Sequence, residues 1–229
     1  MAETDEIVET TVMSAFRVRD PFTKYIFVDN DRRCIEALEG RISALDDEHD
    51  VSLIRRDVRE AVPEIIRAMP RYGPDRGLLS FCFVDPFSAE LDFNVFRQLG
   101  GRYKMDFLIL LMLGRDVRTN FKRYFEDESD TRVANLIDDP EWRSEWAASG
   151  RPSRHLIRFV LKKFDAAMTR IGYQSARPDE AHPIRLIDRN VFLYSLVLYS
   201  KDRLGQRFWE ATRSGLDPQL GLGLPAPGD

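Results

Sequence analysis

Short apolar runs alternate with helix-type patterns along most of this chain, and this alternation is what most limits the possible folds. The runs are rich in β-branched and aromatic residues and end at Asp, Asn, Gly or Pro, as strands do. They span residues 24–28, 51–54, 78–84 and 105–113. Between them apolar residues recur every three or four positions, as in amphipathic helices. Such alternation predicts an α/β protein with a mostly parallel sheet, right-handed crossovers and helices on both faces.

The run at residues 78–84 is apolar at successive positions, which is typical of a strand in the middle of a parallel sheet. Two further strands are expected at residues 184–187 and 191–199. Only Asp188, Arg189 and Asn190 separate them, and so short a polar linker favours an antiparallel hairpin. A mostly parallel sheet with a terminal antiparallel hairpin is the arrangement of class I methyltransferases, a likeness of fold and not of chemistry.

The length of 229 residues suits one α/β domain. We expect that domain over residues 1–213, with a polar helical insertion at about residues 126–150. Trp142 and Trp146 of the insertion are expected to pack on the domain rather than to stack on bases. Residues 214–229 are rich in Gly and Pro and are expected to be disordered.

Charge and cysteine content narrow the possible classes. The formal net charge is -4, so no global basic field marks a nucleic-acid-binding protein. Cys34 and Cys82 argue against a disulfide framework, and both are expected to be buried thiols in a reducing compartment. The three histidines (His49, His155 and His182) are widely separated and give no support to a His/Cys metal site.

Nothing in the sequence predicts a membrane protein. No apolar run reaches the roughly 18 residues that a spanning helix needs. The first ten residues, MAETDEIVET, are acidic and lack the basic-then-apolar order of a signal peptide. We therefore expect a cytoplasmic protein with no membrane partner.

Four stretches have a characteristic order and spacing, and they read PFTKYIFVDND, LLSFCFVDPF, MDFLILLMLG and VFLYSLVLYSKDRLGQRFW. Together they resemble the three-Cys-motif partner proteins (TcmP), a family of bacterial proteins with a methyltransferase-like fold. The resemblance extends from about Glu6 to Thr212. It implies a Rossmann-like methyltransferase fold and a protein partner that bears a three-cysteine motif. The family's reaction is poorly defined, so a fold is implied more firmly than a reaction.

The resemblance implies a site for S-adenosylmethionine. In the methyltransferase fold an acid ends the second strand and accepts hydrogen bonds from the two ribose hydroxyls, and Asp29 matches that acid. The alternative is that Asp29 or Asp31 only caps the next helix. Asp57 and Val58 stand where such folds contact the adenine. Because an aspartate just after a strand is also a common turn residue, a structural role competes with this assignment.

The triplet Asp85-Pro86-Phe87 resembles the catalytic loop of amino-methylating enzymes. Methyl transfer from a sulfonium is an in-line displacement, for which the acceptor amine must be desolvated and aimed. The Asp85 side chain and a carbonyl stiffened by Pro86 are suited to accept the amine hydrogens, and Phe87 to stack on an extruded base. The family usually has Gly where Ser88 stands, and a side chain there narrows the room for a substrate. The alternative is a Pro-containing turn with Phe87 packed inward.

The Gly-rich turn that this cofactor requires after a first strand is missing. Bare backbone must approach the methionine moiety there, yet the first glycine is Gly40, inside the helix expected after Asp29. We therefore expect the first, central strand to be missing. The strands that end at Asp29 and Asp85 would then pair directly, or leave unpaired backbone groups and an open groove. A misassigned start codon, a degraded gene or a strand donated by a partner chain would each explain this truncated pattern.

Three functions remain open. The first is a remnant of an S-adenosylmethionine-dependent N-methyltransferase, impaired as given, that acts on an amino group of a nucleobase or a similar amine. The second is a non-catalytic scaffold that docks another protein. The third is an RNA-binding module, and it ranks last because such a basic face is more often simply solvated. That face comprises Arg151, Arg154, Arg158 and Lys162.

Overall fold

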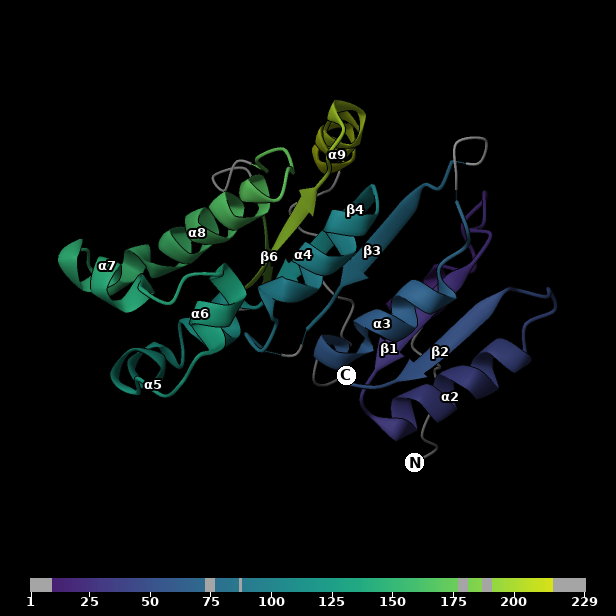
Figure 1. Ribbon diagram of the computed structural model, residues 1–229, viewed down its shortest axis with the longest axis horizontal. Helices are drawn as coiled ribbons and strands as arrows, with labels where there is room; N and C mark the ends of the chain where they lie inside the picture. The colour runs from purple at the N-terminus through teal and green to yellow at the C-terminus, as the bar shows by residue number, and fades with distance from the viewer. Residues whose placement is uncertain (1–9, 73–76, 87, 177–180, 187–190, 216–229) are drawn as a thin grey trace, which may run out of the picture. The chain divides into compact units, whose positions relative to one another are not determined.

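A computed structural model describes residues 10–72, 77–86, 88–176, 181–186 and 191–215 as an α/β protein. The chain divides into two compact units between Arg71 and Tyr72, and Figure 1 shows their elements. We describe each unit by itself. The single domain expected over residues 1–213 stays a prediction.

The first unit is a two-stranded parallel sheet with helices packed against it. Its elements are α1 (Thr11–Ser14), β1 (Tyr25–Asp29), α2 (Arg32–Ser43), β2 (Val51–Arg55) and α3 (Val58–Ala68). The strands pair from Tyr25 beside Val51 to Asp29 beside Arg55, so their carboxyl ends meet at one edge. Both α2 and α3 contact both strands.

The second unit contains a four-stranded mixed sheet in the order β3-β4-β6-β5. Its strands are β3 (Ser80–Val84), β4 (Met105–Leu111), β5 (His182–Leu186) and β6 (Val191–Tyr199). β3 and β4 are parallel, whereas β6 is antiparallel to both β4 and β5. The antiparallel hairpin expected near the C-terminus is thus confirmed, although its connection lies outside the described residues.

Helices complete the second unit (Figure 1). In chain order they are α4 (Phe93–Arg102), the π-helix η1 (Leu113–Val117), α5 (Phe121–Glu126), α6 (Arg132–Ile137), α7 (Trp142–Ala148), the 3-10 helix η2 (Ser153–His155), α8 (Leu156–Arg170) and α9 (Arg203–Gly215). α6 and α7 lie within residues 126–150, so this region is helical as expected, and its being an insertion stays a prediction. Ser214 and Gly215 belong to α9, and the rest of the expected tail lies outside the described residues.

The core lies on one face of the four-stranded sheet. The ring of Phe107 in β4 is 5.1 Å from that of Phe96 in α4, and Phe96 is 5.6 Å from Phe164 in α8. Phe164 in turn contacts Tyr199 of β6 at 5.7 Å. α4 and α8 therefore cover this face together. α9 contacts β6.

The two tryptophans of the insertion are buried, as expected. Trp142 is fully buried and Trp146 is 6% exposed. The ring of Trp146 contacts Phe159 of α8 at 5.2 Å, and the ring of Trp142 contacts Phe125 of α5 at 6.1 Å. Both rings pack within the unit, so neither is presented for stacking on a base.

The expectation that residues 78–84 form a strand buried on both faces is wrong. β3 is hydrogen-bonded only to β4 among the described residues, so it is an edge strand. Phe81 is 48% exposed and Phe83 37%, and Leu79 just before the strand is 98% exposed. These three side chains alternate onto the face opposite α4 and α8. They are exposed because no described strand or helix covers them at this edge.

Each of β1 and β3 has one partner strand among the described residues. β1 is hydrogen-bonded only to β2, and β3 only to β4. The direct pairing of the strands that end at Asp29 and Asp85, expected without a central strand, stays a prediction. One edge of each strand has no partner strand among the described residues.

The expectation of two buried cysteines is wrong for Cys34, which is exposed, and Cys82 is half-buried. α2 turns Ile35, Leu38 and Ile42 toward the protein, and Cys34 lies on its outer side. Its pKa is raised by the nearby charge of Asp29 and, to a lesser degree, by desolvation and Asp31. The sulfur of Cys82 is shielded from water, which raises its pKa to about 12.

Candidate functional site

The loop that begins with Asp85 and Pro86 leaves β3 at the carboxyl end of the second unit's parallel strand pair. β4 ends beside it and continues into η1. Open α/β sheets bind ligands outside the carboxyl ends of their strands, so this loop occupies a ligand-binding position. Phe87, the third member of the expected triplet, lies outside the described residues.

Asp85 is positioned to accept a hydrogen bond. Its side chain is exposed, and no described residue donates to its carboxylate. The surrounding loop nevertheless withdraws the carboxylate partly from water, and this desolvation raises its pKa. An acceptor oxygen without a partner is what the predicted contact with an amine requires.

A small pocket lies beside the loop. Its lining residues are Pro86, Ser88, Ala89, Leu91, Leu111, Met112, Leu113, Val117 and Leu136. The space measures about 10 Å³, which is room for roughly one water molecule. A nucleobase therefore does not fit without movement of the walls. Ser88, which stands where the resembled family usually has Gly, is one of those walls.

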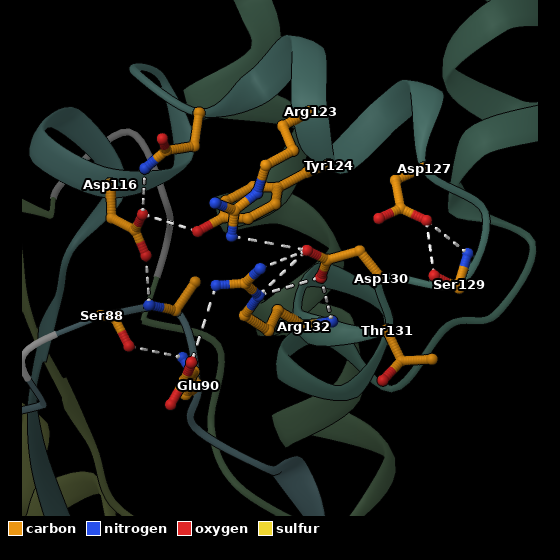
Figure 2. Close-up of polar contacts among 12 residues, drawn as sticks. Ser88, Glu90, Asp116, Arg123, Tyr124, Asp127, Ser129, Asp130, Thr131 and Arg132 are labelled. Atoms are coloured by element: carbon orange, nitrogen blue, oxygen red, sulfur yellow. Dashed lines mark hydrogen bonds and ion pairs between the residues drawn. The ribbon is translucent and has the colours of Figure 1, made fainter.

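A buried carboxylate, that of Asp116 in η1, faces the loop (Figure 2). Asp116 is 8% exposed, and its Oδ2 accepts a hydrogen bond from the backbone N–H of Ala89 at 2.6 Å. Its Oδ1 accepts from the Asn120 side chain and from the Tyr124 hydroxyl, both at 2.6 Å. Burial and the hydrogen bond to Asp116 raise the pKa of Tyr124 to about 12. Asp116 was not predicted from the sequence, although an Asp followed by Asn and Tyr at intervals of four was a signal.

Arg132 of α6 contacts Tyr124, Asp130 and Glu90, and so forms a second link to the loop. Its guanidinium lies 4.8 Å from the Tyr124 ring centre and ion-pairs with Asp130, whose pKa it lowers. The guanidinium also lies 3.6 Å from Glu90, on the segment that leads to α4. Because Glu90 is largely exposed, this second link to the loop is weak. Figure 2 shows Arg132 between the two acids.

In the first unit, Asp29 and Asp31 have different roles. Asp31 is the N-cap of α2 and accepts from the backbone N–H of Arg33 at 2.7 Å, so the capping role considered for it is confirmed. Asp29 is half-buried, and its Oδ1 accepts from the backbone N–H of Asp31 at 2.8 Å. No described residue donates to its Oδ2. The predicted ribose contact of Asp29 stays a prediction.

Asp57 has a structural role. It caps α3, accepting from the backbone N–H of Arg59 at 2.9 Å, and it also accepts from the Arg59 guanidinium through both oxygens. The Arg59 hydrogen bond lowers the pKa of Asp57. Val58 is the first residue of α3. Because Arg59 engages both oxygens of Asp57, only Val58 and the backbone remain available for the predicted contact with the adenine. The adenine contacts of Asp57 and Val58 stay predictions.

The predicted site residues thus fall into two groups. Asp29, Asp57 and Val58 follow β1 and β2 at one edge of the first unit's sheet, where Arg56 N–H donates to Asp29 O at 3.0 Å. Asp85 and Pro86 belong to the second unit. The four residues of the basic face considered for RNA binding are all exposed: Arg151, Arg154, Arg158 and Lys162.

No family model, curated protein or solved structure matches this chain. Within the described ranges, none of the helices has the length and apolarity required to cross a membrane. Nor do three or more His, Cys, Asp or Glu side chains gather there in a way that could hold a metal ion.

Proposed function

We propose that this protein is methyltransferase-like and derives from an S-adenosylmethionine-dependent N-methyltransferase. The strand order carries the proposal. The pair β2-β1 and the set β3-β4-β6-β5, with only β6 antiparallel to its neighbours, have the order of the two halves of a class I methyltransferase sheet. In that fold a central first strand lies between the halves. The free edges of β1 and β3 are where that strand would pair.

The proposed roles follow from the chemistry. S-adenosylmethionine would supply an electrophilic methyl group. Asp29, with its free Oδ2, binds the ribose hydroxyls, and Val58 contacts the adenine. Asp85 and the carbonyl held by Pro86 accept the hydrogens of the acceptor amine and aim its lone pair at the methyl. The raised pKa of Asp85 also favours its taking the proton that the amine loses.

The cofactor site is incomplete without a central strand and its glycine turn, so we propose that the activity of this chain is impaired. Calorimetric titration with S-adenosylmethionine tests this. We expect a Kd weaker than about 100 µM, further weakened by Asp29→Ala and unchanged by Asp47→Ala, an exposed acid of the same unit. Micromolar binding by this chain would contradict an impaired cofactor site. A cofactor affinity that Asp29→Ala leaves unchanged would remove Asp29 from the site.

A non-catalytic docking role is the second candidate, and the exposed edge of β3 favours it. Proteins usually protect an edge strand with charges, proline or a covering segment. Residues 78–84 have no charge, and they expose Phe81 and Phe83. An extended segment of a three-Cys-motif protein would pair with this edge by strand addition.

The docking candidate has its own test. Phe81→Lys should abolish co-elution with a three-Cys-motif protein in size-exclusion chromatography. Phe208→Lys, which changes an equally apolar exposed residue on α9, should not. Co-elution that survives Phe81→Lys would exclude this edge as the docking surface.

A further inference from the structure

We propose that Asp116 is a positioning residue that fixes Ala89, which follows the acceptor residues Asp85 and Pro86, against η1. Its relevance to methyl transfer rests on the proposed function, whereas the tether itself does not. The direct contact is the 2.6 Å hydrogen bond from the Ala89 backbone N–H to Asp116 Oδ2. This bond joins two segments that are 27 residues apart in sequence.

The surroundings of Asp116 explain why a carboxylate stands there. Burying a charge is costly unless hydrogen bonds compensate it, and no described cation forms an ion pair with Asp116. Three donors converge on it instead, from Ala89, Asn120 and Tyr124. Hydrogen bonds to an ionised acceptor are the strong ones.

A carboxylate also fits these donors better than an amide would. Asp accepts through both oxygens and donates nothing, whereas Asn has one accepting oxygen and one donating NH2 group. In Asp116→Asn, if Asn120 and Tyr124 still donate to the side-chain amide oxygen, the NH2 group of that amide faces the Ala89 N–H. Donor would then meet donor, and the loop would lose its tether with almost no change in side-chain volume.

The support for Asp116 is itself anchored. η1 contains π-type hydrogen bonds, in which Arg118 N–H donates to Leu113 O at 2.9 Å and Val117 N–H to Met112 O at 3.4 Å. Such single π-turns are frequent at functional sites. Gly114 packs so closely on β6 that a Cβ there would lie 2.3 Å from Phe192 O. Asp116 therefore links the loop to the sheet rather than to a free segment.

The tether sets the position of the groups that the proposed reaction uses. Pro86, Ser88 and Ala89 form one side of the pocket, and Leu113 and Val117 of η1 form another. With Ala89 bound to η1, the pocket wall that Ser88 and Ala89 form, close in sequence to Asp85 and Pro86, is held before an amine arrives. Preorganisation of this kind lowers the cost of aligning an acceptor.

Residue-resolved amide exchange by NMR tests the tether without any need for activity. In Asp116→Asn we expect the Ala89 amide to exchange at least roughly tenfold faster and its proton resonance to move upfield. Tyr124→Phe, which removes another donor of the same carboxylate, should leave Ala89 exchange within about twofold. Unchanged exchange in Asp116→Asn, or an equal increase in both variants, would overturn the proposal.

A wild-type measurement keeps the test independent of whether the variants fold. A scalar coupling through the hydrogen bond, from the Ala89 nitrogen to the Asp116 carboxylate carbon, should be detectable. Its absence would overturn the tether.

In a methyl-transfer assay, Asp116→Asn should lower kcat while leaving cofactor affinity unchanged, and an unchanged kcat would exclude a positioning role. If the wild type transfers no methyl group, the relevance of Asp116 to methyl transfer fails, whereas exchange and coupling still decide the tether.

Discussion

Asp31 donates its backbone N–H to Asp29 Oδ1 at 2.8 Å, and its own side chain caps α2. Asp29, the last residue of β1, and Asp31 therefore have different roles, which the sequence left as alternatives. Asp31 stabilises the helix, and Asp29 keeps one oxygen without a described partner. This separation allows the two positions to be tested independently.

Asp31→Ala should lower the free energy of unfolding by about 1 kcal/mol, because the first turn of α2 loses its side-chain cap. Urea denaturation followed by circular dichroism measures this. Asp47→Ala, in the exposed segment after α2, should stay within about 0.5 kcal/mol of the wild type. Equal effects of the two substitutions would contradict a capping role for Asp31.

The reactivity of Cys34 reports on the charge of Asp29. Asp29 is the main cause of the raised pKa of this exposed thiol, so Asp29→Asn should lower that pKa and increase the thiolate fraction. Labelling of Cys34 by a thiol reagent near pH 8 should then be faster, and added salt should reduce the difference. A labelling rate that Asp29→Asn leaves unchanged would mean that the carboxylate is not close to the thiol. Cys82 should remain unreactive in both proteins.

Asp57 should make the stability of the protein depend on pH. Its pKa is lowered in the folded state, so its ionised form stabilises the fold above the unfolded value of about 3.9. That contribution is lost as the pH falls through the folded pKa. The stability difference between wild type and Asp57→Asn should therefore be present at pH 6 and shrink below about pH 4. A difference that grew on acidification would contradict the pairing with Arg59.

Gly114 should not tolerate a side chain. A Cβ at this position would lie 2.3 Å from Phe192 O, a backbone atom, so Gly114→Ala should cost about 1–3 kcal/mol of stability. Gly101→Ala is the matched control, because nothing lies within 4 Å of a Cβ there and the residue is helical. It should be neutral or stabilise by up to about 1 kcal/mol. In thermal unfolding, Gly114→Ala should therefore lower the midpoint temperature, and Gly101→Ala should leave it unchanged or raise it.

Hydrophobic periodicity was sufficient to predict most of the secondary structure. The strand expected at residues 24–28 is found at Tyr25–Asp29, and the C-terminal hairpin also forms as expected. The environment of residues 78–84 was predicted wrongly, because apolar side chains indicate a strand without showing which neighbours it has. The exposure of Cys34 was missed for a related reason, since it lies one position from the inward residues of α2.

The candidate site was only partly predictable. Asp85 and Pro86 lie at a strand's carboxyl end as the motif suggested, because a local pattern fixes a local turn. Asp116 was missed because its importance depends on Ala89, which lies next to it only in the folded chain. A structural role as a turn residue was the alternative predicted for Asp57, yet its capping of α3 and its engagement by Arg59 through both oxygens depend on geometry that the sequence does not contain.

The central claim is that β1 pairs with β2 alone among the described residues, which leaves the proposed cofactor site without its central strand. Tyr25 N–H donates to Asp50 O, toward β2, so the alternate amides of Ile26 and Val28 point to the other edge. Residue-resolved hydrogen exchange at these amides is the most direct measurement. We predict fast exchange at Ile26 and Val28 and slow exchange at Phe27. Protection of Ile26 and Val28 equal to that of Phe27 would reveal a strand on the second edge and contradict the account.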